Sequence, residues 1–264
     1  MTDSPHADRA HAALGASNSS IWLNCTGSVP LSVGGSRTGT VYTREGTAAH
    51  ELSELWLHQV MRGLTPAFPA SLTVEGHEIE VTPEMIEYVG VYVETARTLI
   101  DEGIWHGIEV RVDLSELWAP APCPETLFGT ADCIAVTTYG TLFVCDLKYG
   151  KGKMVSPEDN TQLLYYALGA YYALPPEMRA RVYDVQMIIV QPRSRGEKIK
   201  TWEISLADLL MWADTVLKPT VNDIAAGRTR LASGNHCFFC IAAKQCPELH
   251  RAKVQRAVDS FPAL

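Results

Sequence analysis

The chain has 264 residues and a formal net charge of −8, with 47% hydrophobic and 20% charged residues. These values are ordinary for a globular protein of one large domain or two small ones, and the acidic charge disfavours a protein that coats nucleic acid. No run approaches the roughly 20 apolar residues of a membrane helix, and the first 20 residues lack the apolar segment of a secretory signal. We therefore expect a flexible tail over residues 1–20, a single folded domain over residues 21–264, and a cytoplasmic protein.

Two helices are predicted in the first half of the chain. The first covers residues 43–61, and the second begins at Thr82-Pro83, an N-cap and first-turn pair, and ends near residue 102. Residues 63–81 between them are predicted to form a loop. His50 lies within the first helix, where a histidine is by itself more often a surface or core residue than a ligand.

Residues 108–114 are predicted to form a strand because apolar and charged side chains alternate along them. The alternation places Glu109 and Arg111 on one face, where a plain ion pair is one interpretation of the two. The next stretch, residues 115–126, is Pro-rich and predicted to be irregular.

A β-hairpin is predicted next, from two runs rich in Val, Ile, Phe and Thr that flank a Gly-containing turn: Cys133–Thr137 and Leu142–Leu147. Asp132 is expected at the start of the first strand, and Asp146 and Lys148 at the end of the second, so all three meet at one end of the hairpin. Two carboxylates this close repel each other unless a cation joins them, and Mg²⁺ or Mn²⁺ is the natural occupant. The alternative is a salt-bridged hairpin end on a solvated sheet edge.

The remaining elements complete an α/β pattern. A helix over residues 158–170 carries Gln162 and Tyr166 four positions apart on one face. Two strands and two further helices are then predicted: 182–191, 198–205, 206–216 and 220–226. This order indicates a mixed central sheet flanked by helices.

Seven cysteines occur in the chain: Cys25, Cys123, Cys133, Cys145, Cys237, Cys240 and Cys246. The last three lie close together, two of them in a C-x-x-C step that suits a soft metal or cluster. Cys25 is the candidate fourth ligand, and Cys133 and Cys145 are interpreted as core residues inside the hairpin strands. Zinc is the competing occupant, with His236 as an alternative to Cys25, and residue type alone does not separate the two.

The stretch G-T-x-D, followed by D-x-K and Q-x-x-x-Y, resembles the PD-(D/E)XK nuclease superfamily, in particular its RecB-type branch. One departure is that Thr130-Ala131 stands where the name-giving Pro would precede the Asp. The resemblance implies that Asp132 and Asp146 bind the catalytic ion and that Lys148 is the catalytic lysine.

The resemblance extends to further ligands and to the DNA contacts. Gly46–His50 fits the branch's G-x-x-x-H pattern, which implies that His50 binds the ion. The acid on the preceding strand, Glu109, and the backbone carbonyl of Leu147 are further ligands that the resemblance implies. Gln162 and Tyr166 match the branch's Q-x-x-x-Y motif, which implies that they engage the DNA strand. Lys151 and Lys153 are expected to contact DNA because they directly follow the strand that carries Asp146.

The cysteine arrangement resembles the iron–sulfur staple of RecB-type nucleases such as AddB and the CRISPR-adaptation nucleases. It implies a [4Fe–4S] cluster on Cys25, Cys237, Cys240 and Cys246 that joins the two ends of the chain, with the C-terminal ligands in a segment over residues 227–250. The implied function is metal-dependent DNA cleavage, first of all exonuclease activity in recombination, repair or end processing, as in a phage-type recombination exonuclease. A motor activity would come from a helicase, and a single-strand annealing protein is a further expected partner. The alternatives are a non-catalytic DNA-binding or scaffold protein and a structural zinc protein.

Overall fold

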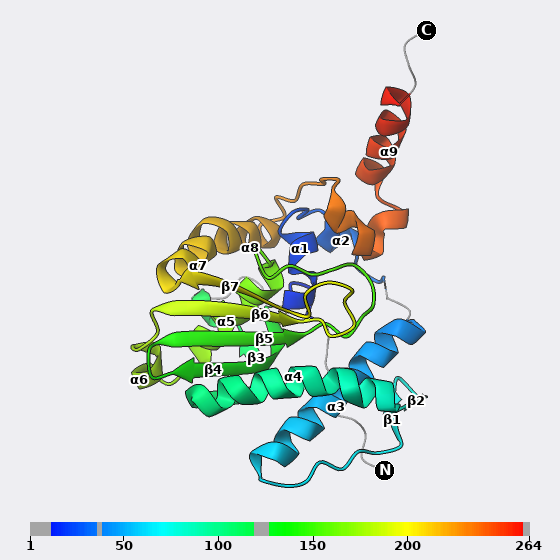
Figure 1. Cartoon of the computed structure of the whole chain (residues 1–264). Helices are drawn as coiled ribbons and strands as arrows, with labels where there is room; N and C mark the ends of the chain where they lie inside the picture. Colours follow the sequence, from blue (N-terminus) through cyan, green and yellow to red (C-terminus); the bar gives the residue numbers. More distant parts are fainter. Residues whose placement is uncertain (1–11, 36–38, 119–126, 261–264) are drawn as a thin grey trace.

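The computed structural model describes residues 12–35, 39–118 and 127–260. Its centre is a five-stranded mixed sheet in the order β3-β4-β5-β6-β7 (Figure 1). The strands are β3 (Gly103–Asp113), β4 (Phe128–Thr137), β5 (Thr141–Leu147), β6 (Asp184–Val190) and β7 (Ile199–Ser205). All neighbouring pairs are antiparallel except β5 and β6, which are parallel. The predicted mixed α/β fold is confirmed.

The parallel pair explains where the helix of the Q-x-x-x-Y motif lies. Parallel neighbours need a crossover connection, and here it contains α5 (Thr161–Ala173) and the short α6 (Pro176–Arg179). Asn160 caps α5, because its side-chain oxygen accepts hydrogen bonds from the backbone N–H groups of Gln162 and Leu163. The crossover therefore fixes α5 beside the carboxyl end of β5.

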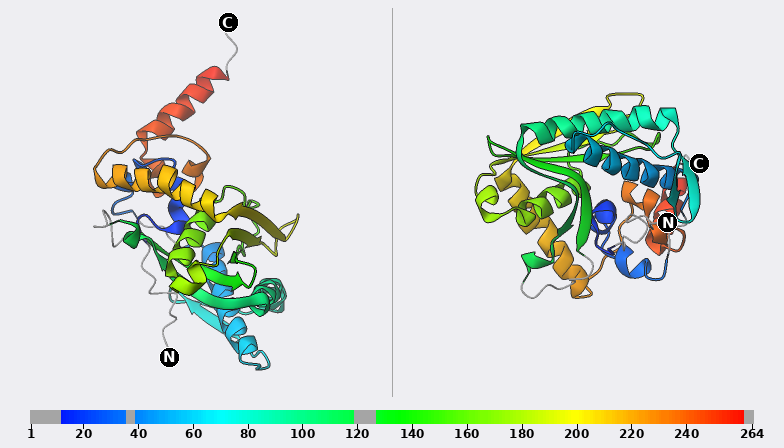
Figure 2. Two further views of the ribbon diagram at one scale, coloured as in Figure 1. Left: turned by 90° about the vertical axis from the view of Figure 1, so that its left-hand side faces the viewer. Right: turned by 90° about the horizontal axis from the view of Figure 1, so that it is seen from below.

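Helices lie on both faces of the sheet (Figure 2), and each face has its own apolar core. α3 (Val41–Met61) and α4 (Pro83–Glu102) cover one face, and α5 and α7 (Leu206–Trp212) cover the other. Thr82 caps α4 and Pro83 occupies its first turn, as predicted. The predicted gap between the helices over 206–216 and 220–226 does not form, because a π-helical turn, Ala213–Leu217, joins α7 to α8 (Lys218–Ala225). Pro219 lies in the first turn of α8, where a proline loses no hydrogen bond.

Three segments differ from the sequence prediction. The predicted loop over residues 63–81 contains a hairpin, β1 (Ser71–Val74) and β2 (His77–Glu80). The predicted tail is too long, because residues from Ala12 onward are packed and Leu14 is 1% exposed in the core beside α5. Short segments that were not predicted follow: η1 (Ala16–Asn18), α1 (Ser19–Trp22), α2 (Ser28–Leu31) and η2 (Ser115–Leu117).

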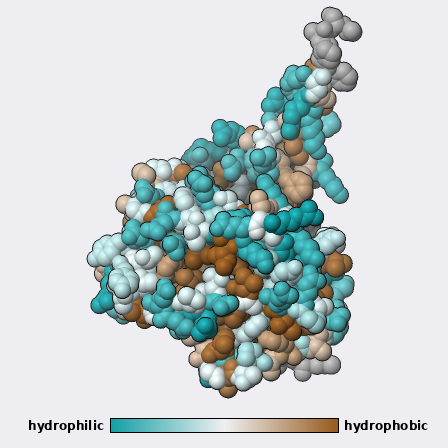
Figure 3. Space-filling model, in the orientation of Figure 1, coloured by the Kyte–Doolittle hydropathy of each residue, from teal (hydrophilic) through white to brown (hydrophobic). Residues whose placement is uncertain are grey.

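The C-terminal part packs against the N-terminal segment and then leaves the body of the protein. It contains η5 (Asn235–Phe239), η6 (Ile241–Lys244) and α9 (Pro247–Asp259), which the sequence pattern did not predict. α9 projects away from the rest of the molecule in Figure 1 and is mainly hydrophilic in Figure 3. Figure 3 also shows apolar residues gathered in the middle of the body of the protein. Within the described residues, no helix combines the length and apolar character required to cross a bilayer.

Candidate metal centre and active site

The pleat of the sheet is broken where two acidic residues face each other. Ile108 pairs with Cys133 and Val110 with Ala131, so Glu109 lies opposite Asp132. Ile108 and Cys133 belong to the core under α3 and α4, whereas Val110 and Ala131, two positions away, belong to the core under α5. Residues two apart on a regular strand share a face, so the alternation fails at this point.

Glu109 carries the backbone strain of this break, with a φ of 51°. A non-glycine residue in the left-handed region costs on the order of 1 kcal/mol or more, and such residues cluster at functional sites. The predicted common face of Glu109 and Arg111 does not form, because the strand changes faces at Glu109. Arg111 instead lies over the ring of Phe128, with 3.8 Å from the guanidinium carbon to the ring centroid.

Three potential ligands from separate elements converge at this break. Donor atoms of His50, Glu109 and Asp132 all lie within 4.8 Å of one another, the one such group of three among the described residues. Nδ1 of His50 lies 3.4 Å from Oδ2 of Asp132, and the same oxygen accepts a 2.7 Å hydrogen bond from the backbone N–H of Leu147. Asp132 lies inside β4 rather than at its start, because β4 begins earlier than predicted.

Asp146 lies opposite Asp132 on β5, beside the paired residues Cys133 and Cys145. Asp132 and Asp146 are 7% and 2% exposed, so the alternative of a solvated hairpin end is wrong. Oδ2 of Asp146 lies 2.6 Å from Nζ of Lys148 as an ion pair, but it accepts no well-directed hydrogen bond. A buried carboxylate oxygen with so little compensation is well suited to a cation.

The charges of this cluster shift its pKa values in opposite directions. Burial opposes protonation of His50, but the negative charges of Asp132, Glu109 and Asp146 together outweigh it and raise the pKa of His50 to about 9. Burial also opposes ionisation of Asp132, yet the charges of His50 and Lys148 lower its pKa. For Asp146 burial prevails over the attraction of Lys148, so its pKa is raised. Divergent pKa values in one cluster are typical of sites that bind cations or transfer protons.

Lys148 is held from a second side by the helix α5. Its Nζ donates a 2.9 Å hydrogen bond to Oε1 of Gln162, and Nε2 of Gln162 donates a 3.0 Å hydrogen bond to the hydroxyl of Tyr166. Tyr166 is 6% exposed and packs close to Gly129, where an added Cβ would lie 2.9 Å from its ring. The side chains therefore form one chain of contacts from Asp146 to Tyr166, in which Tyr166 is buried rather than presented to a ligand.

The loop after β5 carries Lys151 and Lys153. It is held by Gln191, a buried residue at the end of β6, which accepts a hydrogen bond from the N–H of Val155 and donates to the carbonyls of Lys153 and Gly150. The sequence analysis missed Gln191, since a polar residue after an apolar strand gives no sign of its burial. Lys151 forms a 3.4 Å exposed ion pair with Glu84 of α4.

Arg193 is buried although it lies in a run of basic residues, since its side chain is only 7% exposed. Its guanidinium pairs with Glu45 of α3 at 3.1 Å and lies 4.5 Å from the centroid of the Tyr149 ring. This contact connects the turn after β6 to the helix that carries His50.

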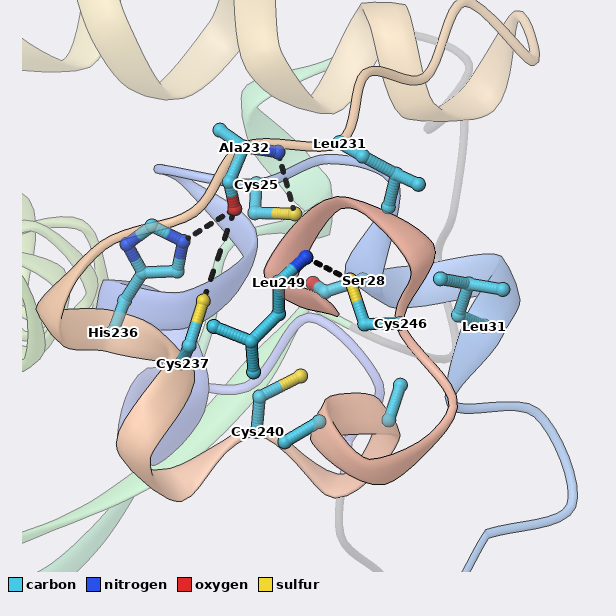
Figure 4. Close-up of a pocket in the computed structure, with 12 residues that line it drawn as sticks. Cys25, Ser28, Leu31, Leu231, Ala232, His236, Cys237, Cys240, Cys246 and Leu249 are labelled. Atoms are coloured by element: carbon cyan, nitrogen blue, oxygen red, sulfur yellow. Dashed lines mark hydrogen bonds between the residues drawn. The ribbon is translucent and has the colours of Figure 1, made fainter. Parts of the chain in front are cut away.

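A second cluster lies between the N-terminal segment and the C-terminal part. Cys25, Cys237, Cys240 and Cys246 line one pocket together with His236 (Figure 4). Backbone N–H groups of Ala232 and Leu249 donate to the sulfurs of Cys25 and Cys246 at 3.4 and 3.5 Å.

Burial raises the pKa of the Cys240 thiol in this pocket, and the neighbouring cysteines add to the shift. Cys133 and Cys145 are buried in the sheet, as predicted, and Cys123 lies outside the described residues.

A family model described as "Protein of unknown function (DUF2800)" matches residues 11–263. The chain belongs to this family. The match covers both clusters, so the metal-centre residues and the four pocket cysteines lie within one family unit.

A solved structure titled "Crystal structure of SSO0001" is similar over 63% of this chain and 72% of its own, with 14% sequence identity and a TM-score of 0.34. Similarity at this level does not identify the fold.

Proposed function

We propose that this member of the family is a metal-dependent DNA nuclease of the RecB-type branch of the PD-(D/E)XK superfamily, acting as an exonuclease. One observation carries the proposal: His50, Glu109, Asp132, Asp146 and Lys148 converge from α3, β3, β4 and β5 and the residue after β5. Helix α3 is distant in the sequence from these three strands, and ordinary packing gives no reason to bring a histidine, three acids and a lysine together.

The donor set suits Mg²⁺ or Mn²⁺. Carboxylate oxygens are the preferred ligands of both ions, and a single imidazole is compatible with Mn²⁺ in particular. A cation would compensate the buried oxygen of Asp146 and would take the place of the His50 proton in the contact with Asp132. His50, Glu109, Asp132 and Asp146 would hold the ion, and the carbonyl of Leu147 stays a predicted ligand. When bound, the ion supplies Lewis-acid stabilisation of phosphate charge and an activated water.

The residues of the chain provide positioning and charge. Lys148, fixed between Asp146 and Gln162, has the reach and charge to orient a water molecule or stabilise negative charge on a phosphate. The hydroxyl of Tyr166 accepts a hydrogen bond from Gln162 and so fixes its position. Tyr166 would therefore help to place the DNA strand through Gln162. Lys151 and Lys153 lie in the loop that follows Lys148 in the sequence, and they supply further positive charge for binding DNA.

The four pocket cysteines support a [4Fe–4S] cluster as the structural cofactor. Four cysteines from the N-terminal segment and the C-terminal part gather at one pocket, which is the ligand number that such a cluster requires. Backbone N–H groups directed at the sulfurs of Cys25 and Cys246 also suit thiolate ligands.

The test is incubation of end-labelled linear DNA and circular DNA with the purified protein and Mn²⁺, beside Lys148→Ala. We expect the wild type to degrade linear DNA and the variant to lose at least a hundredfold in rate, because the charge nearest the phosphate is gone. An Arg97→Ala variant is the matched control, since Arg97 forms an exposed ion pair with Asp101 on α4. Equal degradation by wild type and Lys148→Ala would refute the assigned site, and DNA binding without cleavage would favour the scaffold alternative.

A further inference from the structure

The C-terminal part of the chain is basic although the protein as a whole is acidic. Residues 227–260 carry a net charge of +4, whereas the total is −8. The basic residues of this segment are Arg228, Arg230, Lys244, Arg251, Lys253 and Arg256, and the acidic ones are Glu248 and Asp259. The remainder of the protein is therefore more acidic than the total, and positive charge is concentrated in one lobe, defined here as residues 227–260.

This lobe also presents two adjacent phenylalanines to solvent. Phe238 is 83% exposed and Phe239 is 62% exposed, and their rings meet edge to face with centroids 4.8 Å apart. The exposure has a structural cause, because Cys237 and Cys240 on either side line the pocket and so direct the residues between them outward. A large apolar ring exposed to water to the extent of Phe238, on an ordered turn, is a candidate contact for a ligand.

The same lobe contains a polar cleft. It lies between α9 and Ser233-Gly234, and its other lining residues are Glu248, Arg251, Ala252, Gln255 and Arg256. Gly234 is also the N-terminal cap of η5, the short helix that carries Phe238. The cleft and the rings therefore belong to one lobe, and Arg251 and Arg256 line the cleft from α9.

The chemistry of this surface matches single-stranded DNA. A single strand exposes the faces of its bases together with its phosphates, whereas a duplex hides the base faces inside the stack. Exposed aromatic rings bind base faces without regard to sequence, and neighbouring arginines and lysines bind the phosphates.

We propose that the lobe over residues 227–260 binds single-stranded DNA, with Phe238 and Phe239 stacking on bases and Arg251, Lys253 and Arg256 contacting phosphates. The proposal deepens the nuclease function and rests on it for the choice of DNA as the polymer. It assigns the lobe the role of holding a single strand outside the metal centre.

Binding is measured by fluorescence anisotropy with a labelled oligothymidylate of roughly 20 nucleotides. This length exceeds the roughly 4 to 16 nucleotides that single-strand-binding sites cover. The parent protein is the full-length Lys148→Ala variant with its cysteine site loaded and without added Mg²⁺ or Mn²⁺, so that the probe stays intact. The double substitution Phe238→Ala and Phe239→Ala should weaken binding about tenfold or more. Tyr139→Ala is the control, because Tyr139 is 89% exposed but lies in the turn between β4 and β5.

Three further measurements complete the test. Phe238→Trp should bind at least as tightly as the parent, which separates stacking from a folding defect. Replacing Arg251, Lys253 and Arg256 by Gln should reduce the dependence of affinity on salt concentration. Duplex DNA of the same length should bind more weakly than the single strand.

Binding of the alanine double variant within twofold of the parent would overturn the proposal, as would equal affinity for duplex. If the alanine double variant loses binding to anionic lipid vesicles but binds the oligothymidylate as the parent does, the rings contact a membrane surface. That result would also overturn the proposal. If the wild type binds the oligothymidylate through these rings but cleaves no DNA, the nuclease function fails and the binding site stands.

Discussion

His50 and Asp132 approach each other to 3.4 Å although they belong to a helix and a strand that are distant in the sequence. In the metal-free protein this contact keeps His50 protonated near neutral pH, since the pKa of His50 is raised to about 9. A metal ligand must be a neutral imidazole, so a bound cation has to displace that proton.

The first prediction is therefore that Mn²⁺ affinity rises with pH. Displacement of one proton makes the Mn²⁺ affinity rise about tenfold per pH unit below pH 9, and the affinity stays constant above pH 9. Isothermal titration at pH 7, 8 and 9 measures the slope, and His50→Ala should bind Mn²⁺ more weakly with a shallower slope. An affinity that does not change over this range would exclude His50 as a ligand.

The same pKa shift has a consequence for the metal-free fold. A raised pKa stabilises the folded state fully below the ordinary value of 6.5, and this contribution disappears as pH rises through about 9. The loss of stability between these pH values should be smaller in His50→Ala, as urea unfolding at each pH would show. An identical pH dependence in both proteins would mean that the pair does not form.

The second prediction concerns the contact chain from Lys148 to Tyr166. Tyr166→Phe removes the hydroxyl that accepts from Gln162, so we expect a loss of about two- to tenfold in cleavage rate with little change in stability. Gln162→Ala also removes the hydrogen-bond partner of Lys148 and should lower the cleavage rate about a hundredfold. Single-turnover cleavage and thermal unfolding measure the two effects.

Tyr165→Phe is the matched control for Tyr166→Phe. Tyr165 is the neighbouring buried tyrosine, and its hydroxyl has no hydrogen-bond partner within the described part of the chain. Removal of the Tyr165 hydroxyl should leave the cleavage rate unchanged and should maintain or raise the stability of the protein. A comparable loss of rate in both variants would argue against the role of Gln162.

The third prediction is that Gln191→Ala releases the loop with Lys151 and Lys153. The substitution breaks three hydrogen bonds to the loop backbone and should lower stability by about 1–3 kcal/mol and raise the KM for DNA more than it lowers kcat. Gln186→Ala on the same strand removes an exposed contact to Glu203 and should change stability by less than about 0.5 kcal/mol. A KM that stays at the wild-type value would show that the loop does not contact DNA.

The fourth prediction concerns the cysteine pocket. Anaerobically purified protein should be brown and contain iron, and Cys240→Ser should lose the visible absorbance and become insoluble or partly unfolded. Cys133→Ala serves as the control, because Cys133 lies in the sheet and should leave iron content unchanged. Stoichiometric zinc in place of iron, or a stable and active Cys240→Ser protein, would contradict the iron–sulfur assignment.

The sequence by itself determined the elements whose signals are local. The period of apolar residues identified α3 and α4, Thr82-Pro83 marked the start of α4, and the β-branched runs with their turn identified the β4–β5 hairpin. A side-chain period of two was enough to bring Asp146 and Lys148 together, since both lie on the same strand end.

Tertiary structure decided the features that depend on pairing between distant segments. The change of faces at Glu109 is set by the register of β3 against β4, and no local pattern records it. Burial of Gln191, Arg193 and the segment around Leu14 likewise depends on which elements cover them. Side-chain periodicity reports the conformation of one segment, whereas burial and convergence are properties of the packing between segments, and the approach of His50 to Asp132 exists only after that packing forms.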